Sequence, residues 1–543
     1  MPFKFIKMTS KNILTLTFSL CFVLFSTAQI STSHKIVRGD KYSMDSKKET
    51  LTHLIGGNSE VAYVLKKSKN DRILQKVNSE VSIIKEMELD LSEGKVEKTL
   101  EDVFMIDDNI YLFSSFYNKK KSANYLFYQK INPSSLELEG AVTKIAEVAN
   151  LAKMNAFARL AQKYYGNSGS SFNIITSKDS TKILVHTNIT VSGEDQQKIL
   201  LTVFDTEMNE LWTQTKTLPY DKDLYSLEKL KVDENGNAYA LGKVYKDKKN
   251  KKRSGVPNYK YELLKFSDNG EKLSDYKIAL STEFITDVGF EIANNGDIAC
   301  AGFYSTNKDF SIKGTWYMYI DAKTGEATKL NKKKFDLDFI TSEMTEREEK
   351  KAQKKIAKGK STQLYDYDLD RFIIRDDGGA LLIAEQFHFW VTTTTSVDGN
   401  GNTRTNNTYH YNYKDIVVIN INPDGSIAWN VKIPKEQYTR NDGGYQSSYV
   451  FGLINSDKLI FVFNDDPGSA YRATKRSNSN KEFNDLMMYE VQSDGSVVSE
   501  KLLSTKDFGM LTVPKLSGQL SAKNILLYNE LKKEQQFLKL EFE

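Results

Sequence analysis

A short hairpin pattern occupies residues 230–241, which read Leu-Lys-Val-Asp-Glu-Asn-Gly-Asn-Ala-Tyr-Ala-Leu. Apolar and polar residues alternate on both sides of the Asp-Glu-Asn-Gly turn, as they do in half-buried β-strands. Asn, Asp and Gly suit such a turn because they adopt positive φ at little steric cost. The stretch therefore predicts two antiparallel strands joined by a tight turn.

Two kinds of hairpin recur along the chain. The first kind has seven further copies, and its turns lie near residues 56–58, 107–109, 177–181, 295–296, 377–378, 456–457 and 522–523. The second kind follows each of the first seven units, and its turns lie near residues 78–79, 132–133, 205–209, 268–270, 323–325, 422–425 and 494–495. Two hairpins per unit predict a four-stranded antiparallel sheet, with strands a to d in chain order.

A four-stranded unit repeated roughly every 40 to 65 residues is typical of a propeller blade. We therefore predict an all-β fold, a single eight-bladed β-propeller of four-stranded blades, with seven blades as the alternative count. The blades are expected to begin near Leu51, Glu101, Phe172, Leu227, Gly289, Arg371, Tyr449 and Lys515.

The eighth unit lacks a fourth strand of its own. Residues 537–542 supply its third strand, and the sequence ends there. Residues 30–37, at the start of the expected mature chain, belong to no other unit. We expect this N-terminal strand to pair with the C-terminal strand, because such pairing closes the ring and removes an open sheet edge.

Two of the second hairpins carry further landmarks. Residues 203–212 combine Val203-Phe204-Asp205 with Leu211-Trp212, and residues 319–325 read Tyr-Ile-Asp-Ala-Lys-Thr-Gly. Both resemble the quinoprotein-type (PQQ-like) propeller repeat, in which a strand, an Asp, a Thr-Gly turn and a strand with Trp follow one another. Composition and turn spacing also resemble secreted propellers of unassigned role from gliding and gut Gram-negative bacteria. The resemblance implies the fold and carries over no quinone cofactor and no functional residue.

Residues 1–28 have the pattern of a secretory signal peptide. Three lysines precede or begin an apolar run at residues 13–25, and small residues at 26–28 predict cleavage between Ala28 and Gln29. An apolar run of about 13 residues is shorter than the roughly 20 that a membrane span needs. We therefore expect residues 29–543 to form one propeller domain that is periplasmic, outer-membrane-associated or extracellular.

The charge of the mature chain is nearly balanced. The full sequence has a net charge of +4, and cleavage would remove three lysines and no acidic residue, which leaves about +1. Such a balance gives no reason to expect binding to nucleic acid. Only Cys300 would remain, so no intramolecular disulfide is expected, and its apolar neighbours predict a buried side chain.

Connection lengths differ between the two ends of the predicted blades. In an up-and-down sheet, the a–b and c–d turns emerge on one face and the b–c and d–a connections on the other. All the long connections belong to the second group, so we expect them on one face, where binding surfaces usually lie. They span residues 148–171, 246–258, 331–370, 391–414 and 465–484. Helical patterns at 148–165 and 342–358 predict small helical insertions.

The connection at residues 391–414 is the best binding candidate, because Tyr409, His410, Tyr411 and Tyr413 follow a polar, threonine-rich stretch. Tyrosine-rich polar segments suit sugar stacking or adaptable recognition, and the alternative is an exposed hairpin of no special role. The basic run at residues 246–253 is a second candidate. Its Lys249, Lys252 and Arg253 suit an acidic glycan, and the alternative is a solvated loop.

Searches for catalytic, cofactor-binding and metal-binding patterns find none. Asp398, Asn400 and Asn402 match the first ligands of a calcium loop, but the later glycine and glutamate are missing. No two histidines stand four residues apart as in a zinc helix. We therefore expect neither a cofactor nor a metal.

Together these patterns favour an exported, non-catalytic binding or scaffold propeller, which we expect to be monomeric and to lack a transmembrane segment in its mature form. Its expected partner is a protein or a glycan at the cell envelope, bound through the loop-rich face. The alternative is a polysaccharide-acting hydrolase or lyase with a site at the propeller centre, so the sequence leaves the question of catalysis open.

Overall fold

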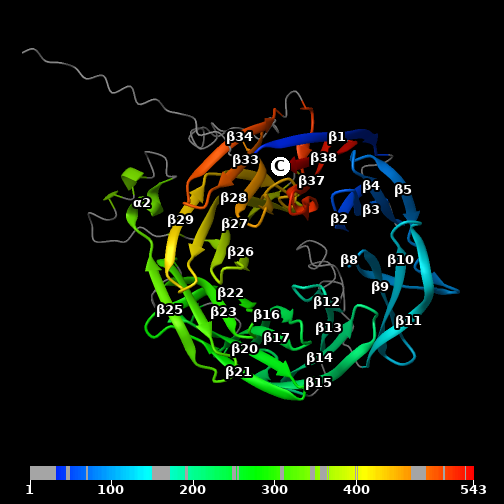
Figure 1. The fold of residues 1–543 in the computed structure, drawn as a ribbon, viewed down its shortest axis with the longest axis horizontal. Helices are drawn as coiled ribbons and strands as arrows, with labels where there is room; N and C mark the ends of the chain where they lie inside the picture. Colours follow the sequence, from blue (N-terminus) through cyan, green and yellow to red (C-terminus); the bar gives the residue numbers. More distant parts are fainter. Residues whose placement is uncertain are drawn as a thin grey trace, which may run out of the picture.

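The computed structural model describes residues 32–543 except 45–48, 69–70, 150–171, 190–193, 248–251, 254–255, 306–310, 343–348, 352, 355–363, 365, 398, 400, 466–484, 505–507 and 532. In this part of the chain, eight antiparallel sheets of four or five strands stand in a ring (Figure 1). The first strand of each sheet lies towards the centre and the fourth at the perimeter. The predicted all-β propeller fold is confirmed.

The sheets of the first half follow the chain from the inner to the outer strand. They are β2 (Glu49–Gly57), β3 (Val61–Ser68), β4 (Asp71–Asn78) and β5 (Ile83–Glu88); β8 (Thr99–Ile106), β9 (Asn109–Asn118), β10 (Ala123–Asn132) and β11 (Glu137–Ala149); β12 (Asn173–Thr176), β13 (Lys182–Ile189), β14 (Gln196–Asp205) and β15 (Glu210–Asp221); β16 (Tyr225–Val232), β17 (Ala238–Tyr245), β20 (Tyr259–Ser267) and β21 (Lys272–Ile278).

The sheets of the second half continue the same order. They are β22 (Phe284–Ile292), β23 (Ile298–Ser305), β24 (Gly314–Ile320) and β25 (Ala327–Lys334); β26 (Tyr367–Ile374), β27 (Ala380–Val397), β28 (Thr403–Ile421) and β29 (Ile427–Ile433), with β30 (Gln437–Arg440) added beside β28; β31 (Val450–Ile454), β32 (Lys458–Asp465), β33 (Asp485–Val491) and β34 (Val497–Leu503); and β35 (Leu511–Thr512) with β36 (Gly518–Ser521), β37 (Asn524–Leu531), β38 (Glu534–Phe542) and β1 (His34–Ser43).

Short elements occupy some of the connections. Among the described residues they are the two-stranded pairs β6 (Ser92–Glu93) with β7 (Val96–Glu97) and β18 (Lys252–Arg253) with β19 (Val256–Pro257), the helix α2 (Leu337–Thr341) and the 3₁₀ turn η1 (Pro514–Leu516). No helix in the described residues is long and apolar enough to cross a membrane.

The two ends of the chain close the ring. β1 pairs antiparallel with β38, from His34 opposite Phe542 to Ser43 opposite Glu534 (Figure 1). This confirms the predicted pairing of the terminal strands, although the strand lies at His34–Ser43 and extends beyond the predicted end at residue 37. β1 thereby covers the edge of β38 that would otherwise be unpaired.

The hydrophobic core is divided among the sheet-to-sheet contacts. Eight clusters of buried side chains each combine residues from two successive sheets, and the cluster with Leu51, Val64, Leu526 and Tyr528 joins the first sheet to the last. Cys300 is fully buried in one of these clusters, as its neighbours in the sequence predict. The ring is therefore held by packing between sheets as well as by the closing strand.

Aromatic side chains on outer strands add polar contacts to the following sheet. The Trp212 indole N–H donates to Gly236 O at 2.9 Å, and the Trp429 indole N–H donates to Ser493 O at 2.9 Å. The Tyr276 hydroxyl donates to Ala322 O at 2.8 Å in the same way. Each of these bonds satisfies a turn carbonyl of the neighbouring sheet and fixes the two sheets relative to one another.

One predicted insertion differs from expectation, and the two predicted helices lie largely outside the described residues. Residues 391–414 form no separate loop, because β27 and β28 continue as a regular paired hairpin as far as Val397 and Thr403. The many Thr and Tyr residues in this stretch have high strand propensity, and cross-strand pairing satisfies the backbone groups of the hairpin. The predicted helix at 148–165 lies almost wholly outside the described residues, as does much of the one at 342–358.

Candidate functional site

The connections of each sheet alternate between the two faces of the ring, because its four strands are successive antiparallel neighbours. The b–c and d–a connections therefore share one face, which we call the long-connection face, and the a–b and c–d turns share the short-turn face. On the long-connection face, β30 belongs to the connection after β29 and pairs with the projecting part of β28, at His410 to Tyr413. β30 thereby widens the hairpin into a three-stranded platform.

One face of this platform carries a line of aromatic rings, the aromatic strip, formed by Phe389, Tyr409, Tyr411 and Tyr413. Phe389 lies 5.2 Å from Tyr411 and 6.3 Å from Tyr409 between ring centroids, and it is nearly parallel to Tyr409. Residues two apart in a strand share a face, which places the three tyrosines in a row. The side chain of Tyr409 is 38% exposed, whereas that of Tyr413, at the base of the strip, is buried.

The opposite face of the platform holds His410. Its ring lies parallel to that of Trp390 at 4.7 Å, and its two nitrogens lie 2.6 Å from the Tyr438 hydroxyl and 2.9 Å from the Thr392 hydroxyl. His410 is buried by these neighbours. The structure therefore separates His410 from the three tyrosines, although all four residues are consecutive or nearly so in the sequence.

The basic candidates lie elsewhere. Lys249 is outside the described residues, and the backbone of Lys252 and Arg253 forms β18 in the connection between β17 and β20. A complete sheet, β22 to β25, separates this connection from the sheet of the platform. The structure therefore does not bring the basic run together with the tyrosines. The cleavage site at Ala28 and Gln29 also lies outside the described residues.

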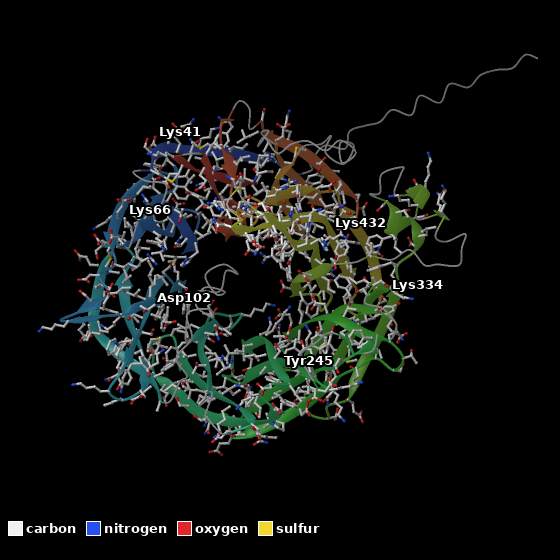
Figure 2. All side chains as sticks on the ribbon, turned by 180° about the vertical axis from the view of Figure 1, so that it is seen from behind. Lys41, Lys66, Asp102, Tyr245, Lys334 and Lys432 are labelled. Carbon is white, nitrogen blue, oxygen red and sulfur yellow. The ribbon has the colours of Figure 1, made fainter. Side chains whose placement is uncertain are left out.

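A repeated irregularity shapes the inner wall of the ring near the long-connection face. Near the start of five inner strands the pairing register skips one residue, and that residue is polar in each case. Two further skips, at Ile55 in β2 and Leu520 in β36, involve apolar residues. A bulge of this kind re-aims the side chain that it frees. The skipped residues are Thr52, Glu101, Glu228, Thr286 and Asp370. Asp102, which follows one of these bulges, lies towards the inside of the ring in Figure 2.

Beneath the aromatic strip lies a buried ion pair. Lys435 Nζ is 2.7 Å from Glu385 Oε1, and both side chains are almost completely buried. The Ser448 hydroxyl donates to Glu385 Oε2 at 2.8 Å, and Gln437 Oε1 lies 3.3 Å from Lys435 Nζ. Each charge therefore has polar partners, as burial of an ion pair requires.

Two further contacts extend this cluster towards the centre. The Tyr449 hydroxyl donates to Asp370 Oδ2 at 2.7 Å, and Lys515 Nζ donates to the Tyr413 hydroxyl at 2.9 Å. Burial, together with the nearby charge of Glu385, raises the pKa of Asp370 to about 7. Burial lowers the pKa of Lys515, against the opposing effect of Glu385 and Asp442.

Arg371 and Lys515 both line a cavity of about 510 Å³ between the inner strands of the last three sheets, which we call the Lys515 cavity. Tyr449, Phe451, Ser517 and Gln519 are among its other walls. Both cationic residues are water-accessible. The cavity therefore joins an aromatic surface to ionisable groups that a ligand could reach.

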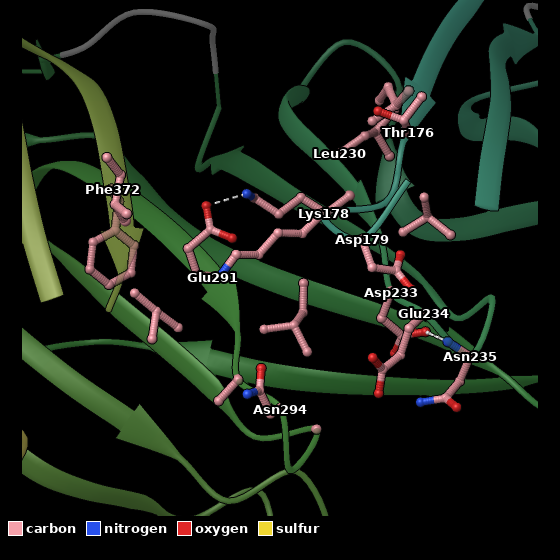
Figure 3. Close-up of a pocket in the computed structure, with 18 residues that line it drawn as sticks. Thr176, Lys178, Asp179, Leu230, Asp233, Glu234, Asn235, Glu291, Asn294 and Phe372 are labelled. Atoms are coloured by element: carbon pink, nitrogen blue, oxygen red, sulfur yellow. Dashed lines mark hydrogen bonds and ion pairs between the residues drawn. The ribbon is translucent and has the colours of Figure 1, made fainter. Parts of the chain in front are cut away.

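A second cavity, of about 570 Å³, lies towards the short-turn face (Figure 3). Its charged groups engage one another: Lys231 pairs with Glu291, and Asp233 accepts hydrogen bonds from the Asn235 backbone, the Asn237 amide and the Tyr239 hydroxyl. Apolar side chains such as Leu230 and Phe372 form much of the rest of its lining. These contacts serve the packing of adjacent sheets, so we place the candidate site at the Lys515 cavity.

Sequence reasoning identified Tyr413 but missed Asp370, Arg371, Glu385, Lys435 and Lys515. One available signal is the bulge pattern itself, an apolar residue followed by two polar ones, as in Leu100-Glu101-Asp102, Leu227-Glu228-Lys229 and Leu369-Asp370-Arg371. Among the described residues, no group of three or more His, Cys, Asp or Glu side chains is arranged to hold a metal ion.

Comparison with known proteins yields likenesses of fold only. No protein-family model and no curated protein matches the chain. Solved structures that resemble it include the WD40 domain of SCAP from fission yeast, at 10% identity over 94% of this chain and 98% of that chain with a TM-score of 0.38. Others are the β-propeller domain of the trilobed protease from Pyrococcus furiosus (10%, 86% and 98%, TM-score 0.34) and the polysaccharide lyase Uly1 (8%, 92% and 100%, TM-score 0.36). Likenesses this remote carry no argument about function.

Proposed function

We propose that the protein is an exported binding propeller that recognises a glycan at the cell envelope through its long-connection face. The observation that carries this proposal is the aromatic strip on the β27–β28 hairpin, which ends at the Lys515 cavity. Flat aromatic rings stack on the apolar C–H faces of sugars, and the adjacent polar groups can bind the hydroxyls.

The rigid setting of the strip supports recognition. Tyr413 at its base contacts Phe387 at 4.5 Å between ring centroids, and β30 pairs with β28 along the same stretch. The aromatic rings are therefore held in place before a ligand arrives, which lowers the entropy lost on binding.

The test uses substitutions confined to the upper strip, because Tyr413 is buried and its replacement would also disturb packing. We expect Tyr409→Ala combined with Tyr411→Ala to weaken glycan binding at least roughly tenfold, with the Tm changed little. His388→Ala, an exposed residue on the opposite face of the same hairpin, is the matched control.

Binding would be measured on a glycan array and by pull-down with the mature chain. Unchanged glycan binding by the double variant would contradict the proposal. Capture of a protein partner without any glycan signal would replace the glycan by a protein ligand. The proposed export is tested separately by N-terminal sequencing of the cell-envelope fraction, which should begin at Gln29.

A hydrolase or lyase acting on a polysaccharide is the second candidate, and Asp370 is the observation that favours it. A carboxyl group with a pKa of about 7, hydrogen-bonded to Tyr449 on the wall of the Lys515 cavity, is suited to proton transfer near neutral pH. In that case Asp370→Asn abolishes release of sugar products and leaves array binding intact. Absence of products from the wild-type protein on every bound glycan would exclude this candidate.

A further inference from the structure

The Lys515 cavity contains two cationic side chains whose charges are not neutralised by a direct ion pair. Among the described residues, neither Arg371 nor Lys515 has a carboxylate within 4.0 Å of its nitrogens, whereas Lys435 is paired with Glu385. Arg371 instead lies over the ring of Phe451, 5.1 Å from its centroid. Stacking of this kind uses the face of the guanidinium and leaves its N–H edge available.

Lys515 can likewise donate to a further acceptor. Its ammonium group has three N–H donors, and its contacts in the described residues are the Tyr413 hydroxyl at 2.9 Å and Gly443 O at 3.4 Å. Both acceptors are neutral at physiological pH, since burial raises the pKa of the Tyr413 phenol. A charged acceptor would therefore complete the coordination of Lys515.

The neighbouring carboxyl groups compete weakly for these cations. Of the two that act on Lys515, Glu385 is paired with Lys435 and Asp442 accepts a hydrogen bond from the Thr439 hydroxyl. Asp370 already accepts a hydrogen bond from Tyr449, and a pKa of about 7 leaves it substantially protonated at neutral pH. The wall around Arg371 and Lys515 is otherwise formed by hydroxyl, amide and apolar groups such as Ser517, Gln519 and Phe451. Such a site favours a ligand that carries a negative charge.

The position of the cavity connects this charge preference to the aromatic strip. Tyr413 is the last ring of the strip and also the acceptor for Lys515. We propose that the Lys515 cavity is an anion subsite, in which Lys515 and Arg371 bind the carboxylate or sulfate group of an acidic glycan held on the aromatic strip. The inference rests on the proposed glycan binding and specifies its ligand class.

The test is a glycan array that carries uronate-containing and sulfated oligosaccharides beside their carboxyl-reduced and desulfated counterparts. We expect the mature wild-type protein to prefer the acidic members at least roughly tenfold, since each charged contact contributes that order of discrimination. Lys515→Met combined with Arg371→Gln should remove the preference. Lys85→Met, which removes an exposed charge from the perimeter strand β5, should retain it.

A conservative variant guards against misfolding. Lys515→Arg keeps the charge and should keep the preference for acidic members, with the far-ultraviolet circular dichroism and Tm of every variant measured in parallel. The uronate and sulfate members of the array distinguish the two possible anionic groups.

The outcomes separate this inference from the proposed function. Binding to neutral glycans with equal strength, or an acidic preference that survives in the folded double variant, would overturn the anion subsite and leave glycan binding standing. Failure to bind any glycan would overturn both proposals. Acidic preference that is lost in the double variant but kept in Lys85→Met and Lys515→Arg supports the inference.

Discussion

His186 shows at the residue scale how burial alone sets a chemical property. Its side chain is fully buried on β13, with Nδ1 3.3 Å from the Asn173 amide. Among the described residues its Nε2 has no hydrogen-bond partner. Burial therefore lowers the pKa of the imidazole from 6.5 to about 4, because no carboxylate compensates for desolvation of the charged form.

A pH-dependent stability follows from this shift. Between about pH 6.5 and pH 4 the unfolded chain binds a proton at His186 that the folded chain does not, so the free energy of unfolding falls as the pH falls. Relative to His186→Leu, we expect the wild type to lose on the order of 3 kcal/mol between pH 7 and pH 4. Urea titrations at several pH values measure this difference. If the difference in free energy of unfolding between the two proteins stays constant across that range, the lowered pKa of His186 is refuted.

At the scale of the element, side chains of outer strands hold neighbouring sheets together. The Trp212 ring on β15 lies against the turn between β20 and β21, where Gly270 has a φ of +76° and a Cβ would come within 2.7 Å of the indole. The indole also donates to Gly236 O. Sequence reasoning identified Trp212 as part of a repeat, but its partner turn belongs to the next sheet and is not encoded in the local pattern.

We expect Trp212→Phe to destabilise the fold by about 1 to 3 kcal/mol, because it removes one buried hydrogen bond and leaves a void beside Gly270. Leu211→Ala, at the adjacent and 42% exposed position, should change the stability by less than about 0.5 kcal/mol. Thermal and urea unfolding measure both. Equal effects of the two substitutions would show that the contact between Trp212 and the next sheet contributes little.

The platform illustrates the limit of element prediction. The alternating Thr and Tyr residues at 391–414 were expected to form a loop, yet they continue β27 and β28 in register. The same polar residues are compatible with a long loop and with two extended strands, so the local sequence does not distinguish the two structures. The difference is decided by pairing with the partner strand β27 and with β30. The residues of β30 lie between 24 and 30 positions along the chain from their partners in β28, so this pairing is not visible in the local pattern.

At the scale of the whole molecule, stability depends on closure of the ring. β1 is the outermost strand of a sheet whose other strands come from the C-terminus, and Ile36 and Val37 pack against two different core clusters. Without β1, the edge of β38 would be open and both clusters would lose side chains.

Removal of residues 29–43 should therefore lower the Tm and promote self-association through the exposed edge of β38. Size-exclusion chromatography and thermal unfolding of a chain that begins at residue 29 and of one that begins at residue 44 measure the two effects. Lys35→Ala is the control, because the Lys35 side chain is 76% exposed. A truncated chain that stays monomeric with an unchanged Tm would show that the other seven sheets hold the ring by themselves.

The sequence by itself determined the repeated hairpins and the pairing of the two ends of the ring. Turn residues with positive φ and alternation with a period of two are local properties, so they can be read from short stretches. Tertiary structure alone decided the candidate site, whose residues extend from Asp370 to Lys515. They meet because bulges re-aim single side chains and because the inner strands of three sheets converge. Neither effect changes the local alternation of apolar and polar residues enough to reveal the site in the sequence, because both depend on how the sheets pack together.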